Sequence, residues 1–177
     1  MTAFFDLFVR HSADPSVRDD PTWADRSFPD VVASSPFHLW RPGDPIAKSG
    51  ARYLIGVATW SGYDMRLLDL IAETICPNPV DPLANIAQTL RRSLVAPPAI
   101  DVFNMADCRQ DSDVARYISG LGSVSQTPIG GLWRDGQLEW SGQGHLAREF
   151  LAGQFGFSSS EVVAFVQDRI KARQCTP

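Results

Sequence analysis

The stretch Trp60–Asp64 (Trp-Ser-Gly-Tyr-Asp) most constrains the fold, because a strand-like run precedes it and a helix-like run follows it. Residues 53–58 are short, apolar and partly β-branched, which is typical of a buried strand. Residues 65–75 carry leucine and isoleucine at helical spacing. A second strand is predicted over 99–105. The order strand, helix, strand predicts two parallel strands joined by a crossover helix.

The second half of the chain contains a hairpin pattern between helices. A helix is expected over 112–119. Two strand-like runs, 129–133 and 137–140, then flank a turn that contains Asp135-Gly136, and Asp-Gly between such runs is a strong hairpin signal. A helix is expected to follow Gly144 and to run through Phe150. These elements predict an α/β fold with a mixed sheet and helices on both of its faces.

The chain divides into three expected parts: an N-terminal arm over 1–50, a central domain over 51–157 and a C-terminal helix over 158–177. Within the central domain, an insertion at about 76–99 carries an amphipathic helical pattern over 83–94. The arm is too apolar to stay free in solvent, so we expect it to pack on the core or on a partner. Its large apolar side chains are Phe4, Phe5, Phe8, Trp23, Phe28, Phe37 and Trp40.

Three pairs of residues match helix capping boxes, in which a hydroxyl side chain and an acid three residues later satisfy each other's backbone N–H groups. They are Thr22-x-x-Asp25, Ser61-x-x-Asp64 and Ser158-x-x-Glu161. At the second pair we expect Ser61 to accept from the first helical turn and Asp64 to bond back to Ser61. Such a cap contributes about 1 kcal/mol.

Composition and charge restrict the function classes. The net charge of −4 argues against binding to nucleic acid or to an anionic membrane surface. No apolar run approaches the roughly 20 residues that span a bilayer, and no basic leader opens the chain, so a cytoplasmic location is expected. The cysteines (Cys76, Cys108 and Cys175) form neither a disulfide framework nor a zinc pattern, and we predict no metal and no cofactor.

Three features in this order resemble the thioredoxin-like superfamily, over roughly residues 52–155. The first is the apolar strand that runs into Trp60–Asp64 and then into a helix. The second is Thr127-Pro128, at the place of the family's cis-proline before the hairpin. The third is the spacing of eight residues from Pro128 to Gly136. The resemblance implies a thioredoxin-like mixed sheet flanked by helices, with an N-terminal arm, an inserted helix and an extra C-terminal helix.

The departures from that family are equally informative. Ser61 and Asp64 stand where the family has its two cysteines, and Ile55 stands where many members have a buried proton-relaying acid. Thiol exchange requires a thiolate, and a serine hydroxyl does not replace it at neutral pH. The sequence therefore excludes a dithiol oxidoreductase and favours a protein that is not an enzyme.

The resemblance also implies a binding surface. Trp60, Ser61 and Tyr63 would lie beside Thr127 and Pro128, where active relatives bind substrate polypeptide. An aromatic rim that has lost its thiols favours a groove for another protein or peptide. The simpler alternative is structural: Trp60 covers the core and Pro128 only turns the chain.

Our sequence-based hypothesis is a redox-inactive scaffold, assembly factor or chaperone-like adaptor. The arm is a second candidate contact, including for a homodimer. Two enzymatic alternatives remain open. Ser61 could stabilise a ligand thiolate in a glutathione-dependent transferase, and Cys108, between an aspartate and an arginine, could serve a single-thiol oxidoreductase.

Overall fold

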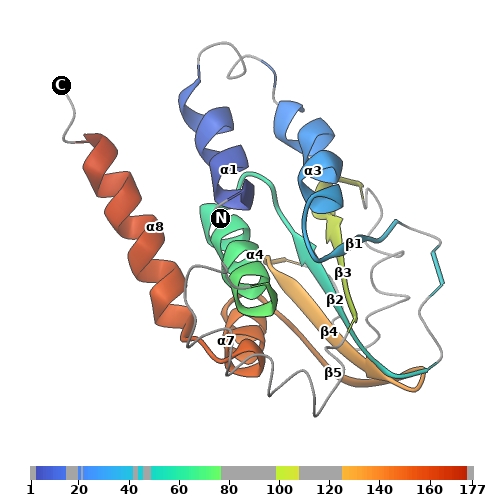
Figure 1. Cartoon of the computed structure of the whole chain (residues 1–177). Coiled ribbons are helices and arrows are strands. Elements are labelled where there is room, and N and C mark those ends of the chain that lie inside the picture. Colours follow the sequence, from blue (N-terminus) through green and yellow to red (C-terminus); the bar gives the residue numbers. More distant parts are fainter. Residues whose placement is uncertain are drawn as a thin grey trace.

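The computed structural model describes residues 3–14, 20, 22–41, 44–45, 49–76, 99–107 and 125–174. The expected helices over 83–94 and 112–119, together with Cys108, lie outside these residues. In chain order, the helices and strands are α1 (Ala3–Ala13), α3 (Trp23–Ala33), β1 (His38–Leu39), β2 (Ala51–Val57), α4 (Gly62–Ile75), β3 (Ala99–Asn104), β4 (Ile129–Arg134), β5 (Gln137–Gln143), α7 (Gly144–Phe155) and α8 (Ser159–Gln174), with a short 3-10 turn over Met105–Asp107 (Figure 1).

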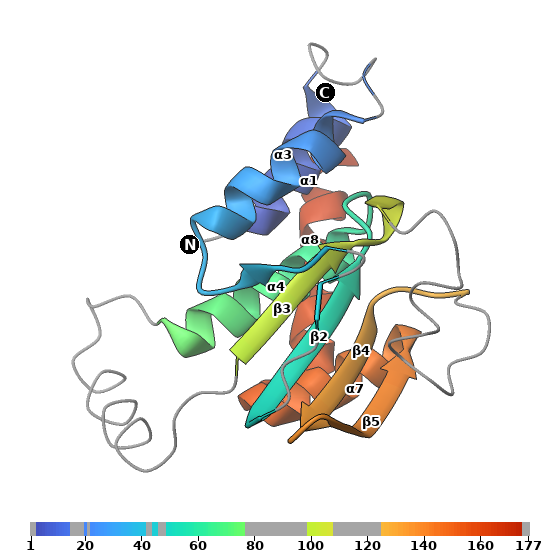
Figure 2. The same ribbon diagram turned by 90° about the vertical axis from the view of Figure 1, so that its right-hand side faces the viewer.

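The strands form one mixed sheet, in the order β1-β3-β2-β4-β5. β1 and β2 both run parallel to β3, whereas β4 runs antiparallel to β2 and β5 antiparallel to β4. Figure 2 shows these strands side by side, with α4 and α7 behind them. The expected α/β class and mixed sheet are therefore confirmed, and the strand–helix–strand unit is β2–α4–β3.

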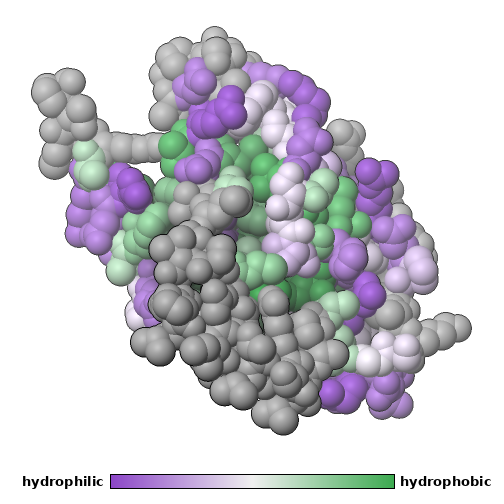
Figure 3. All heavy atoms as spheres, viewed as in Figure 1, coloured by the Kyte–Doolittle hydropathy of each residue, from purple (hydrophilic) through white to green (hydrophobic). Residues whose placement is uncertain are grey.

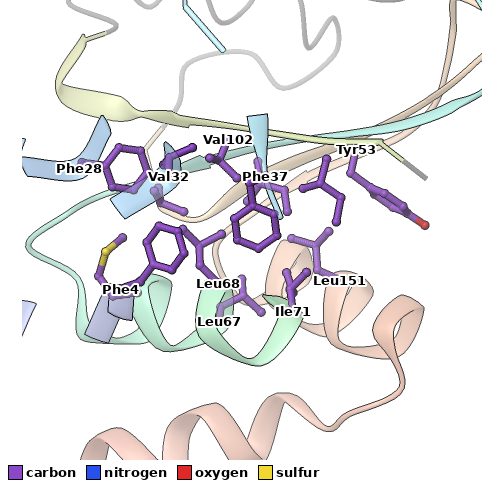
Figure 4. Close-up of a cluster of buried hydrophobic side chains, with 14 of the residues drawn as sticks. Phe4, Phe28, Val32, Phe37, Tyr53, Leu67, Leu68, Ile71, Val102 and Leu151 are labelled. Carbon is purple, nitrogen blue, oxygen red and sulfur yellow. The ribbon is translucent and has the colours of Figure 1, made fainter. Parts of the chain in front are cut away.

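The main hydrophobic core lies between the sheet and the helices. β2 directs Tyr53 and Ile55 into it, and every helix that the structure describes contributes at least one buried side chain. Figure 4 shows Leu68 and Ile71 of α4 meeting Phe37 and Val102 from the sheet side. On the face in Figure 3, apolar side chains gather in the centre and hydrophilic ones lie around them.

A second, smaller cluster lies on the opposite face of the sheet. It contains Trp40, Leu54, Phe103, Ile129 and Trp133. The two clusters follow from strand periodicity, because neighbouring residues such as Leu54 and Ile55 point to opposite faces. Each α-helix that the structure describes contributes to the main core on the other face, so the expectation of helices on both faces is not confirmed by the described residues.

The predicted arm contributes to both clusters. Phe4, Phe28 and Phe37 are buried in the main core, Trp40 is buried in the second cluster, and β1 forms one edge of the sheet. Those aromatic side chains therefore pack on the chain's own core.

A buried carboxylate anchors the start of the arm. Asp69 on α4 accepts from the N–H groups of Phe4 and Phe5, each at 2.9 Å. These donors lie in the first turn of α1, where backbone N–H groups lack partners within their own helix. Asp69 therefore caps α1 from another helix, and its burial raises its pKa to about 7.

Because of Asp69, the free energy of unfolding should fall as the pH rises from about 4 to about 7. Its ordinary pKa is 3.8 and its folded pKa is about 7, so the native state binds the extra proton in this window. Asp69→Asn should remove about 2–4 kcal/mol of that pH dependence. Urea unfolding across the window would measure it, and equal pH slopes for the two proteins would contradict it.

The hairpin prediction is confirmed. Asp135 and Gly136 link β4 to β5 with positive φ angles of 51° and 79°, as a two-residue type I′ turn requires. Asp135 also accepts from the N–H of Gly50 at 2.8 Å, which fastens the turn to the start of β2. β5 continues to Gln143, beyond the predicted end at 140.

The capping predictions at the starts of α3 and α8 have different outcomes. At α8, Glu161 accepts from the N–H of Ser158 at 3.0 Å, so this half of the capping pair is confirmed. The Ser158 hydroxyl accepts from the N–H of Ser160 at 3.2 Å and not from that of Glu161. At α3, the capping prediction is wrong, because the Thr22 side chain makes no cap. Its hydroxyl donates to Asp20 instead, and Asp25 bonds to residues outside the helix.

α8 packs against α4 and α7, on the side of α4 that faces away from the sheet (Figures 1 and 2). Val162 and Val166 are buried, as their helical spacing predicts, whereas Ile170 is 42% exposed. Phe5 meets Phe165 edge-on at 5.0 Å between ring centroids. Among the described residues, no helix combines the length and apolarity needed to cross a membrane.

Candidate binding site at the strand–helix junction

The stretch singled out by the sequence lies at the junction between β2 and α4. β2 ends at Val57 and α4 begins at Gly62. The N–H of Ser61 donates to the carbonyl of Ala58 at 2.9 Å and closes a tight turn. The Ser61 hydroxyl oxygen accepts from the N–H of Asp64 at 3.3 Å. Ser61 is therefore the N-cap of α4, as predicted.

The other half of that capping prediction is wrong. The Asp64 carboxylate does not bond back to Ser61, because the N–H of Ser61 is already used by Ala58. Instead, Asp64 accepts from the N–H of Ala58 at 3.0 Å. Asp64 is fully buried, and this burial raises its pKa. The Ala58 N–H, the side chains of Thr127 and Ser61 and the charge of Arg148 act in the opposite direction.

Thr127 and Pro128 are distant from the junction in sequence, but the fold brings Thr127 close to it. The Thr127–Pro128 peptide bond is cis, as predicted. Pro128 is buried, and its carbonyl accepts from the N–H of Gly144 at 2.8 Å. The Thr127 side chain lies near the Asp64 carboxylate and acts to lower its pKa. The structure thus brings Ser61, Asp64 and Thr127 together.

The two aromatic residues of the junction lie in different surroundings. Trp60 is 59% exposed, so it does not cover the core. Tyr63 is half-buried and packs against the main core, with the Arg148 guanidinium 5.2 Å from its ring centroid. The junction therefore presents one free indole and one aromatic ring held beneath an arginine.

Two functional candidates were not found from the sequence. Arg148, on α7, lies over Tyr63, and its buried Nε makes no hydrogen bond with the described residues. Asp25, on α3, accepts from the Thr59 hydroxyl and from the Asn104 side-chain amide, each at 2.6 Å. Neither residue is close to the junction in sequence. Each lies near it only because its helix packs there in the folded protein.

The chemistry available at the junction is limited. Positions 61 and 64 carry no sulfur, and the Ser61 oxygen is used as a helix cap. Cys76, the free cysteine of the described residues, is exposed at the opposite end of α4. Within those ranges, no three His, Cys, Asp or Glu side chains are grouped to hold a metal ion. Cys108 lies outside the described residues.

Comparison with known proteins does not assign the chain to a family. No protein-family model matches the chain, and no curated protein matches it.

Proposed function

We propose that the chain is a redox-inactive protein with a thioredoxin-like fold, which binds an extended segment of another protein beside Trp60. Three observations support the fold. The sheet has the order β1-β3-β2-β4-β5, α4 begins directly after β2 at the junction, and a cis-proline precedes the β4–β5 hairpin.

The observation that carries the binding role is the exposure of Trp60 on a turn that is held firmly. A free indole is a large apolar group, and tryptophan is enriched at the energetic centres of protein interfaces. The turn beneath it is fixed by the Ala58–Ser61 and Ala58–Asp64 hydrogen bonds. A rigid exposed aromatic loses little conformational entropy when a partner covers it, which favours binding.

The residues around Asp64 and Tyr63 at the junction favour a polypeptide as the ligand. Thr127 is partly exposed and directly precedes the buried Pro128 and β4, so its backbone lies beside the end of a sheet strand. An extended segment can pair with such backbone groups and place alternate side chains on either side. Arg148, over Tyr63, adds a nearby cation for a polar or acidic side chain of that segment.

The two enzymatic alternatives predict activities that the binding role does not. A transferase would need Ser61 to donate to a ligand thiolate, which its O–H group can do while the oxygen accepts from the helix. Glutathione binding would also favour a helix after Pro128, whereas Pro128 leads directly into β4. Cys108 supplies the thiol of the second alternative.

Insulin reduction should be absent in the purified protein, because no thiol occupies position 61 or 64. Glutathione conjugation takes its thiol from glutathione rather than from the protein, and it should be absent if the junction only binds protein. Spectrophotometric assays of both reactions, with an active thioredoxin and a glutathione transferase as positive controls, would measure this. Activity that disappears in Ser61→Ala or in Cys108→Ser would overturn the proposal in favour of the corresponding enzyme.

If the protein forms a homodimer through its arm, the contact must use arm residues other than the buried aromatic ones. Phe4, Phe28 and Phe37 are taken up by the chain's own core. Any contact between two copies through the arm would use its exposed face, and light scattering on the purified chain would reveal it.

A further inference from the structure

The Trp60 turn is tied to the N-terminal arm by one carboxylate. Asp25 of α3 accepts from the Thr59 hydroxyl and from the Asn104 side-chain amide through the same oxygen. Thr59 directly precedes Trp60, and Asn104 is the last residue of β3. Thr59 is 1% exposed and Asn104 is fully buried. The contact therefore joins the arm to the ends of two neighbouring parallel strands.

A second carboxylate holds the same turn from the other side. Asp64 of α4 accepts from the N–H of Ala58, one residue before Thr59. Ala58 and Thr59 are thus each bound by a different aspartate, and the two aspartates come from different helices. Hydrogen bonds to carboxylates are stronger than those between neutral groups, so this pair of contacts restricts the turn on both sides.

α1 adds an apolar contact at the other end of the turn. Phe8 packs so closely on Gly62 that a Cβ atom added at Gly62 would lie 2.9 Å from the Phe8 ring. α1 itself is fixed by the bonds from Asp69 to its first turn. The arm consequently touches the junction at Thr59 and at Gly62, on either side of Trp60.

We propose that Asp25 is a positioning residue for the Trp60 site: it acts through Thr59, so that the N-terminal arm is needed to hold the binding surface in place. The proposal rests on the proposed function, because the site that it positions is the Trp60 surface. It adds that removing the Asp25–Thr59 bond should release the turn locally and weaken partner binding, without any contact between Asp25 and the partner.

The test uses the full chain carrying Thr59→Val, which keeps the shape of the side chain and removes the hydroxyl donor. Backbone hydrogen exchange over residues 58–62 should accelerate about tenfold or more, while exchange in β4 and β5 stays unchanged. Affinity for the purified partner should fall at least about fivefold. Thr59→Ser restores the hydroxyl and should restore both values. Thr74→Val, the same substitution on the exposed side of α4, is the matched control.

Unchanged exchange over 58–62 in Thr59→Val would overturn the proposal, and so would faster exchange with unchanged affinity. If Thr59→Val does not fold, Asp25→Asn is measured in the same way, because it keeps the shape and removes the charge. The proposed function fails separately: Trp60→Ala would then leave the affinity unchanged, whereas the exchange measurement needs no partner.

Discussion

Replacing Trp60 with alanine should weaken binding of the native partner by about 30-fold or more. The indole is 59% exposed on a turn held by two aspartates, so its removal takes away contact area and leaves the fold intact. Truncation of an interface hot spot costs at least about 2 kcal/mol, which corresponds to that factor. The double variant Trp60→Ala/Tyr63→Ala should bind more weakly still.

The measurement begins with capture of the partner from the native host by the wild-type chain. The isolated partner is then titrated against each variant by calorimetry. Ile170→Ala is the matched control, because it truncates another exposed apolar side chain, on α8, and should leave the affinity within about twofold. Equal affinities of wild type and Trp60→Ala would remove Trp60 from the contact surface.

Gly56→Ala should destabilise the protein by about 3 kcal/mol. Gly56 is the second-last residue of β2, opposite Phe103 of β3 and Ile129 of β4. An added Cβ would lie 2.8 Å from Phe103 Cε2 and 2.6 Å from Ile129 Cγ1, and both side chains are buried. Neither neighbour can move away without disturbing the smaller cluster, which they share with Trp133.

Urea unfolding of Gly56→Ala beside Gly153→Ala would test this explanation. Gly153 lies within α7 on the exposed surface, and an added Cβ would meet nothing within 4 Å. The second variant should therefore gain up to about 1 kcal/mol from helix propensity. Similar stabilities of the two variants would show that the space around Gly56 does not limit its side chain.

Local patterns were sufficient to predict much of this fold. The cis bond at Pro128 was expected from the resemblance to the thioredoxin-like superfamily. The β2–α4 junction, the Asp135-Gly136 turn and the Glu161 bond to Ser158 are each encoded within a few neighbouring residues. Helical spacing likewise predicted the buried face of α4. These features depend on backbone conformation and on short-range periodicity, which a single sequence displays directly.

The contacts that complete the candidate site could not be predicted in this way. Asp25 lies 34 residues from Thr59 and 79 from Asn104 along the chain, and only the packing of α3 against the sheet brings them together. The Thr22-x-x-Asp25 pattern predicted a helix cap, whereas the Asp25 carboxylate in fact bonds to Thr59 and Asn104. Asp64 lies in the predicted helix turn, but its carboxylate bonds to the N–H of Ala58 and not to that of Ser61, because the Ser61 N–H donates to the Ala58 carbonyl.

Hydrogen exchange of the free chain and of its complex with the purified partner would locate the binding surface on the protein. If an extended segment binds beside Trp60, amides over 58–63 and 125–127 should exchange more slowly in the complex, and those over 167–172 of α8 should not change. Protection confined to α8, or to any region away from the junction, would contradict the proposed binding surface.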